Sequence, residues 1–124
     1  MQSRSELSMK VQNSPDPVKP NYGGACVTEL IPTFLEGKKE PSWIAEEVLA
    51  SRQVVLFVLD GLGWHQLMER VSGLPTLKRF IGGPITTVAP STTAAALTSI
   101  TTGVPPGEHG LVGYRIPIGE KVLN

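Results

Sequence analysis

A continuous apolar run at residues 54–59, V-V-L-F-V-L, constrains the fold more than any other feature of the sequence, and it is followed directly by Asp60 and Gly61. The run has the length of a strand and is rich in β-branched residues. It lacks the alternation of apolar and polar residues that a strand with one solvated face shows. The pattern therefore predicts a central strand of a parallel sheet, with Asp60 at its carboxyl end.

The segments that follow alternate between helix and strand signals. Apolar residues at helical spacing predict helices over residues 64–73 and 75–81. Residues 85–89 predict a second strand, and residues 93–102 predict a third helix, with Leu97 and Ile100 packed inward and Gly103 at its end. The order strand, helix, helix, strand, helix indicates an α/β domain with a parallel sheet and right-handed crossovers.

The two ends of the chain differ in character. Residues 1–22 are polar and contain three prolines, which predicts a flexible lead-in. Helical signals follow at residues 30–36, with an interruption near Pro32, and at residues 42–51, where Ser42 suits the helix cap. The carboxyl end predicts a strand that enters a hairpin at Gly119. Because a parallel sheet needs more strands than these, we expect residues 23–124 to be the amino-terminal portion of one α/β domain whose carboxy-terminal part is missing.

Composition excludes several classes of partner. The 124 residues carry 11 basic and 11 acidic side chains, so no net charge favours a nucleic-acid duplex or an anionic membrane. The longest apolar run is far shorter than the ~20 residues of a membrane span, and the amino terminus is too polar for a signal peptide. Cys26 is the only cysteine, so it forms no internal disulfide and most simply packs. We expect a cytoplasmic protein, whose oligomeric state the sequence leaves open.

Polar side chains follow both predicted strands. Asp60 comes after the first, and Ser91, Thr92 and Thr93 come after the second. Because ligands of open α/β sheets bind at the carboxyl ends of the strands, these side chains are candidates for a site, with Asp60 as an oxygen ligand for a metal. The alternative is structural: Asp60 and either Thr92 or Thr93 are helix caps.

A threonine nucleophile at this position needs help to ionise. The dipole of the helix that begins at Thr93 contributes only ~0.3 to 2 kcal/mol, too little to deprotonate a hydroxyl at neutral pH. A bound zinc ion lowers the pKa of a coordinated water by ~9 units and acts on a coordinated alcohol in the same way. Thr93 is therefore a credible nucleophile only where Asp60 helps to hold a metal beside it.

The two stretches together resemble the alkaline phosphatase superfamily, specifically its type I phosphodiesterase and nucleotide pyrophosphatase branch. That branch has an apolar strand ending in D-G, then P-x-x-T, T-G, P and H-G at fixed offsets, with a T-P-x-L helix start between them. The residues at those offsets are Pro90, Thr93, Thr102, Gly103, Pro106, His109 and Gly110, and the segment at residues 75–77 is similar to the helix start.

The resemblance implies a three-layer α/β/α fold with a largely parallel central sheet and a hydrolase that uses two divalent metal ions, most simply zinc. Asp60 is then a metal ligand, and Thr93 both contacts the metal and attacks phosphorus, which gives a covalent phospho-threonine intermediate. The substrate is a small phosphodiester or pyrophosphate. The family's other Asp and His ligands lie downstream of the nucleophile. His65 and His109 correspond to none of them, so the given chain cannot assemble the whole centre.

The sequence departs from the family pattern at one position, and it also leaves other functions open. Many relatives carry an asparagine after H-G that donates to a phosphate oxygen, and here Tyr114 takes that place. The C/S-x-P-x-R motif of sulfatases is absent. His109 matches a family histidine whose implied role is to position the turn after the helix. The main alternative is an inactive fragment or phosphate-binding module without catalysis. A dinucleotide site at D-G-L-G-W ranks lower because the third glycine is missing.

Overall fold

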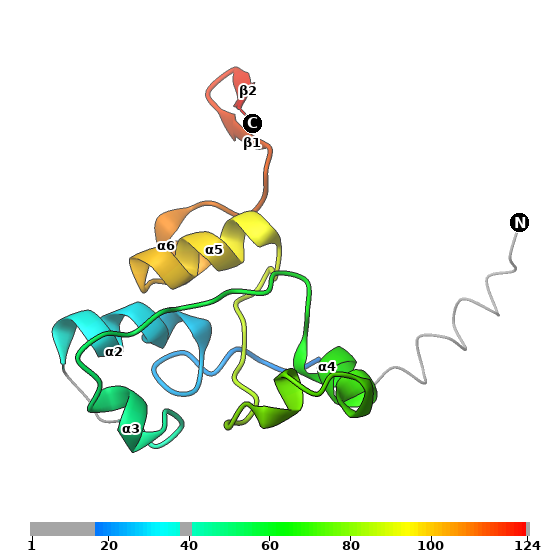
Figure 1. Ribbon diagram of the computed structural model, residues 1–124. Coiled ribbons are helices and arrows are strands. Elements are labelled where there is room, and N and C mark those ends of the chain that lie inside the picture. The colour runs from blue at the N-terminus through cyan, green and yellow to red at the C-terminus, as the bar shows by residue number, and fades with distance from the viewer. Residues whose placement is uncertain (1–16, 38–40, 124) are drawn as a thin grey trace, which may run out of the picture.

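The computed structural model describes residues 17–37 and 41–123, and shows a small helical body from which the carboxyl-terminal hairpin projects (Figure 1). The prediction for residues 1–16 lies outside this part of the chain. In chain order the elements are η1 (Val27–Glu29), α2 (Leu30–Glu36), α3 (Glu46–Leu49), α4 (Trp64–Arg70), η2 (Val71–Gly73), η3 (Leu77–Arg79), α5 (Thr93–Thr102), α6 (Pro106–His109), β1 (Ile116–Ile118) and β2 (Lys121–Leu123), where η denotes a 3-10 helix.

Pairing between strands is limited to two places in the described residues. Strands β1 and β2 form an antiparallel hairpin with Ile116 opposite Leu123, and its turn contains Gly119 at a φ of 61°. The predicted hairpin is therefore confirmed. A single parallel bridge joins Cys26 to Thr86 within the second predicted strand. The described part of the chain thus combines helices with a small two-stranded sheet, and the two predicted parallel strands do not pair with each other.

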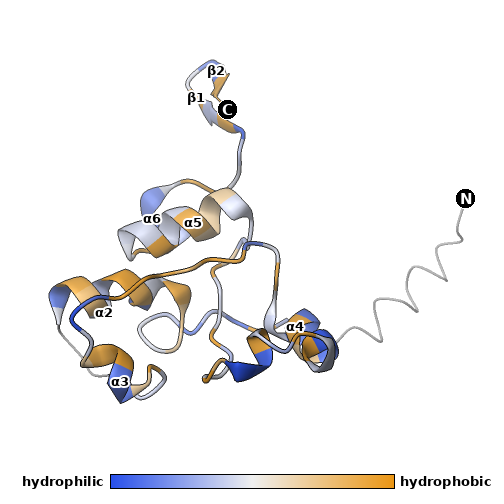
Figure 2. Cartoon of the chain, viewed as in Figure 1, coloured by the Kyte–Doolittle hydropathy of each residue, from blue (hydrophilic) through white to orange (hydrophobic). Residues whose placement is uncertain are grey.

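The apolar run at residues 54–59 is extended but belongs to no sheet, and the prediction that it is buried is wrong for the described residues. Val55 is 88% exposed and Phe57 is 76% exposed. Figure 2 shows the run as an extended apolar segment between α3 and α4. A strand becomes buried and hydrogen-bonded only when neighbours flank it, and no described residues provide them.

Helix α5 has the boundaries that the sequence predicts, because both ends carry strong local signals. Thr92 is the N-cap, and its hydroxyl oxygen accepts a hydrogen bond from the Ala95 N–H at 3.4 Å. At the other end Gly103 has a φ of 75°. The buried face differs from the prediction: Ala95 and Ser99 are fully buried, whereas Leu97 is 40% exposed. Small side chains allow close packing, and α5 lies against η1, α2 and α6.

The core is small and lies between α5 and the segments that precede it. Its fully or nearly fully buried side chains are Cys26, Thr28, Val88, Ala95 and Ser99. The packed position expected for Cys26 is therefore confirmed. Among the described residues, no helix is both long and apolar enough to cross a membrane.

The remaining helices follow the sequence signals to different degrees. Residues 64–73 form α4 and η2 as predicted, but residues 75–81 form only the short η3. The helix predicted for residues 42–51 is reduced to α3, with Ala45 as its N-cap in place of Ser42. Helix α2 continues through Pro32 without interruption, because a proline in the first turn of a helix lacks only an N–H that has no partner there.

Gly103 provides a test of the packing between α5 and α2. A Cβ at Gly103 would lie 2.5 Å from Cγ of Pro32, whereas a Cβ at Gly37, the C-cap of α2 with a φ of 60°, would meet nothing within 4 Å. We expect Gly37→Ala to cost about 1 to 2 kcal/mol from backbone strain alone. Gly103→Ala adds the clash, about 1 to 3 kcal/mol more. Urea unfolding of the two variants measures the difference, and equal losses would contradict the close packing.

Candidate active site

Asp60 is placed by the turn that ends the extended segment. The Leu62 N–H donates to the Leu59 carbonyl oxygen at 3.2 Å, and Gly61, the third residue of this turn, has a φ of 79°. A type II turn requires a positive φ at its third position, which a glycine adopts without strain. The turn therefore presents Asp60 at its second position, with an exposed side chain.

Thr93 is the first residue of α5 and is half-buried. Its hydroxyl donates a hydrogen bond to Asp60 Oδ2 at 2.8 Å, although the two residues are 33 positions apart. The segment that ends at Asp60 passes the start of α5 in Figure 1. The two residues that the sequence assigns to the site are thus in direct contact, in a region that a solute can reach.

Thr92 connects the start of α5 to the loop that follows α6. Its hydroxyl donates to the Val112 carbonyl oxygen at 2.9 Å while its oxygen caps the Ala95 N–H. The structural interpretation of Thr92 as a helix cap is therefore correct, and it leaves Thr93 free of that role. The cap also fixes the loop beside the Asp60 and Thr93 pair.

Ser99 and His109 connect α5 to α6 further along the helix. The Leu111 N–H donates to His109 Nδ1 at 3.1 Å, so this nitrogen is an acceptor and the ring proton lies on Nε2. His109 Nε2 then donates to Ser99 Oγ, which lies 2.9 Å away and is fully buried. His109 therefore positions the turn after the helix, as the resemblance to the family implies. His65 lies on the exposed surface of α4.

Tyr114 is not part of the contact between Asp60 and Thr93. Its side chain is 68% exposed, and its phenol forms no hydrogen bond with any described residue. It lies two residues after Val112, whose carbonyl is bound by Thr92. The loop that contains Tyr114 is thus attached next to the site, but no contact tests its predicted role in substrate binding.

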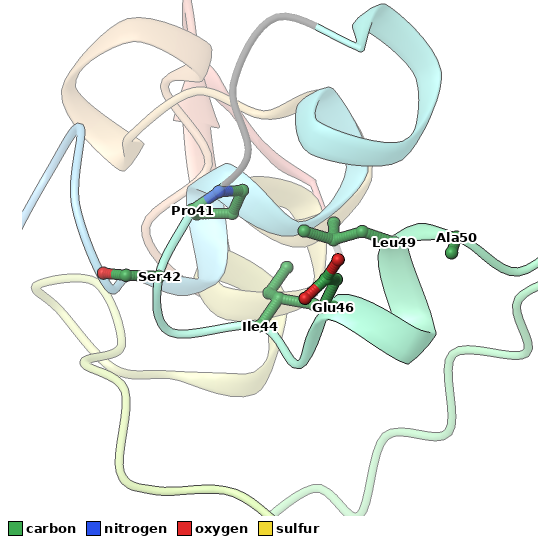
Figure 3. Close-up of a pocket in the computed structure, with 6 residues that line it drawn as sticks. All are labelled: Pro41, Ser42, Ile44, Glu46, Leu49 and Ala50. Atoms are coloured by element: carbon green, nitrogen blue, oxygen red, sulfur yellow. The ribbon is translucent and has the colours of Figure 1, made fainter.

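The hollow beside α3 lies in a different part of the molecule and contains none of the predicted site residues. Its volume is about 320 Å³, and Figure 3 shows the six residues that line it. These are Pro41, Ser42, Ile44, Glu46, Leu49 and Ala50. A single carboxylate among apolar and small side chains offers neither a nucleophile with a partner nor a set of metal ligands, so we assign this hollow no chemistry.

The described residues contain no complete set of metal ligands. No group of three or more His, Cys, Asp and Glu side chains in residues 17–37 and 41–123 could hold a metal ion. Asp60 and Thr93 offer two oxygen ligands 2.8 Å apart. A catalytic zinc site uses three protein ligands and an open fourth position. The pair therefore fits a portion of a zinc coordination sphere and does not complete it.

Sequence patterns did not reveal two of the contacts around the site. Tyr22, in the segment expected to be a flexible lead-in, accepts a hydrogen bond from the Ala89 N–H at 3.4 Å. Ser99 lies within the helix predicted for residues 93–102, and it is the buried partner of His109. The signal available for Ser99 was its spacing from Ala95: two small residues four positions apart lie on the same face of a helix. No local signal exists for Tyr22, because its partner is 67 residues away.

Comparison with known proteins identifies the family. Searches of curated proteins and of solved structures gave no match. The sequence model of the type I phosphodiesterase / nucleotide pyrophosphatase family matches residues 54–122, which is more than half of the chain and includes Asp60, Thr93 and His109. The match confirms the resemblance seen in the motifs, and the chain belongs to the type I phosphodiesterase / nucleotide pyrophosphatase family.

Proposed function

We propose that this chain supplies the nucleophile and part of the metal centre of a hydrolase that cleaves phosphodiester or pyrophosphate bonds. The observation that carries the proposal is the 2.8 Å hydrogen bond from Thr93 Oγ1 to Asp60 Oδ2. It joins the first residue of α5 to the turn after the extended segment, inside the region matched by the family model. The name of the family supports the class of reaction.

In the proposed reaction, Thr93 Oγ1 attacks the phosphorus atom of a small phosphate ester. A bond forms between Oγ1 and phosphorus, and the bond to the leaving oxygen breaks, with its electron pair going to that oxygen. The proton of the Thr93 hydroxyl passes through water to the leaving oxygen. Water then cleaves the phospho-threonine and restores the hydroxyl. Asp60 Oδ2 already accepts the hydrogen bond of that hydroxyl, so it orients the proton away from the lone pairs that attack. Tyr114 is proposed as a donor to a phosphate oxygen, on the strength of its position after H-G.

Asp60 and Thr93 are the residues of this chain that would hold a divalent metal ion, most simply one of two zinc ions. Both offer hard oxygen atoms, and both are accessible. A bound ion supplies positive charge that lowers the pKa of a coordinated oxygen. We propose that the remaining ligands lie outside the described residues, because residues 17–37 and 41–123 contain no further group suited to this role.

The proposal extends to the fold of the complete domain. The apolar side chains at residues 54–59 are 39% to 88% exposed in this chain. Exposing a contiguous stretch of this kind is unfavourable, by roughly 25 cal/mol for each Å² of apolar surface. We propose that the stretch becomes a central strand of a three-layer α/β/α fold, with its cover supplied by residues outside the described part. The bridge between Cys26 and Thr86 supports parallel pairing at the second predicted strand.

Trapping the covalent intermediate tests the assignment of Thr93. The full-length protein is mixed with bis(4-nitrophenyl) phosphate in the presence of zinc, quenched in acid within the first turnovers and digested for mass spectrometry. We expect a phosphoryl adduct that fragmentation of the peptide assigns to Thr93, and none on the surface residue Thr101 of the same helix. Steady turnover without any adduct on Thr93 would reject the nucleophile.

A second candidate function follows from the incomplete metal site. The described residues hold no set of three metal ligands, and that observation favours a chain that binds a phosphate group without cleaving it. In this case inorganic phosphate binds to the protein without zinc, and no substrate is turned over. Isothermal titration with inorganic phosphate, with and without a chelator, distinguishes the two functions, since the hydrolase requires zinc and the binding module does not.

A further inference from the structure

The segment before η1 is attached to the segment at residues 85–89, which leads to Thr93. The Asn21 N–H donates to Thr86 Oγ1 at 2.9 Å, and the same hydroxyl donates to the Ala25 carbonyl oxygen at 3.0 Å. Two backbone bonds run alongside: Thr86 N–H donates to the Ala25 carbonyl at 2.9 Å, and Val27 N–H donates to the Thr86 carbonyl at 3.0 Å. Four hydrogen bonds therefore hold residues 21–27 against Thr86, although residues 21–27 lie outside the region matched by the family model.

Among residues 21–27, Tyr22 makes the contact that lies nearest to Thr93 in the sequence. Its phenol oxygen accepts a hydrogen bond from the Ala89 N–H at 3.4 Å, and Ala89 is four residues before Thr93. Val88 is 2% exposed and thus fixed by burial. The residues from 89 to 92 are all exposed, so burial does not hold the turn between Val88 and the nucleophile. Hydrogen bonds at its two ends do this instead, from Tyr22 at the start and from Thr92 at the end.

The turn that contains Tyr22 is itself fixed by hydrogen bonds. The Gly24 N–H donates to the Asn21 carbonyl oxygen at 3.0 Å and closes the turn that contains Tyr22. The Gly23 N–H donates to Glu29 Oε1 at 3.1 Å, and the same carboxylate oxygen accepts from the hydroxyl of Thr28 at 3.0 Å. Thr28 is 1% exposed. The phenol is therefore presented to Ala89 from a turn that is anchored in the core.

We propose that Tyr22 is a positioning residue for the nucleophile: its phenol fixes the backbone at Ala89 and thereby the turn that delivers Thr93. This inference rests on the proposed function, in which Thr93 attacks phosphorus. A nucleophile contributes fully only when it is held about 3 to 3.5 Å from the atom that it attacks, and a misplacement of about 1 Å costs on the order of 100-fold in rate. Without the hydrogen bond from the Ala89 N–H to Tyr22, the exposed turn at residues 89–92 samples such misplaced positions.

The test compares Tyr22→Phe with the unaltered full-length protein in two independent measurements. The substitution keeps the ring and removes only the acceptor oxygen. We expect kcat for bis(4-nitrophenyl) phosphate to fall by about 10-fold with KM within about twofold, because the turn is mispositioned in the transition state without any loss of ground-state binding. We also expect the amide hydrogen of Ala89 to exchange with solvent several-fold faster, because its acceptor in the folded protein is the phenol oxygen that the substitution removes.

The control is Val18→Ala, which changes another exposed residue of the same segment and should alter neither measurement. A rise in KM at constant kcat would overturn the proposal, because it would place Tyr22 on the substrate and not on the turn. Unchanged exchange and unchanged kinetics in Tyr22→Phe would also overturn it. Should the unaltered protein hydrolyse no phosphate ester, the proposed function fails, and hydrogen exchange alone decides whether Tyr22 holds the turn.

Discussion

Thr93→Ala is expected to lower kcat for a phosphodiester by at least about 10³-fold, because the variant has no oxygen to form the bond to phosphorus. The side chain is half-buried at the start of α5, and the helix cap is provided by Thr92, so the helix should keep its structure. Steady-state kinetics with bis(4-nitrophenyl) phosphate and saturating zinc measures the loss. Circular dichroism confirms that the variant folds.

Two variants sharpen this result. Thr93→Ser keeps a hydroxyl at the same place and should retain a large part of the activity, which separates the loss of the nucleophile from a disturbance of the helix. Thr101→Ala removes the same groups from an exposed position on the same helix, where the hydroxyl donates only to the Leu97 carbonyl, and should leave kcat unchanged. Turnover by Thr93→Ala at the normal rate would remove Thr93 from the mechanism.

Asp60→Asn is expected to weaken zinc binding by on the order of 100-fold, because the substitution removes a charged oxygen ligand while it keeps the shape of the side chain. The amide oxygen of asparagine still accepts the hydrogen bond from Thr93, so the contact that orients the hydroxyl persists. Activity should therefore fall at limiting zinc and recover in part when zinc is added in excess. Isothermal titration with zinc measures the affinity directly.

The matched control for Asp60 is Glu69→Gln, which removes one charge from the exposed surface of α4. Glu69 pairs with Arg70 at 3.1 Å, but both side chains are more than 60% exposed, so the pair contributes little to stability. Zinc affinity should not change in this variant. If Asp60→Asn binds zinc as tightly as the unaltered protein does, Asp60 is not a ligand, and its contact with Thr93 serves only to orient the hydroxyl.

The parts of the fold that the sequence predicts correctly are those fixed by neighbouring residues. A threonine cap and a glycine with a positive φ set both ends of α5, and a glycine turn sets the hairpin of β1 and β2. The contact between Asp60 and Thr93 was also predictable, because both residues follow extended segments and belong to motifs with fixed offsets. These signals lie close together in the sequence, so they can be recognised without information about distant parts of the chain.

The parts that the sequence does not predict depend on partners far away in the chain or absent from the described residues. The run at residues 54–59 has a clear strand composition, yet composition cannot provide the neighbouring strands that would bury it. The helix predicted from Ser42 shortens to α3, because a weak local preference is easily overridden. The hydrogen bond from the Ala89 N–H to Tyr22 cannot be predicted, because a bond across 67 residues leaves no periodic pattern in the sequence.

The exposed run also has a consequence for handling the protein. V-V-L-F-V-L is six residues long and contains no charge, proline or glycine, and apart from the Leu59 carbonyl its backbone forms no hydrogen bond with the described residues. Segments of this kind stack between copies into cross-β ribbons, in which identical side chains interdigitate in a dry interface. A preparation limited to residues 17–124 is therefore prone to form fibrils as its concentration rises. A lysine in place of Phe57, the second most exposed side chain of the run, would act as a gatekeeper against this stacking.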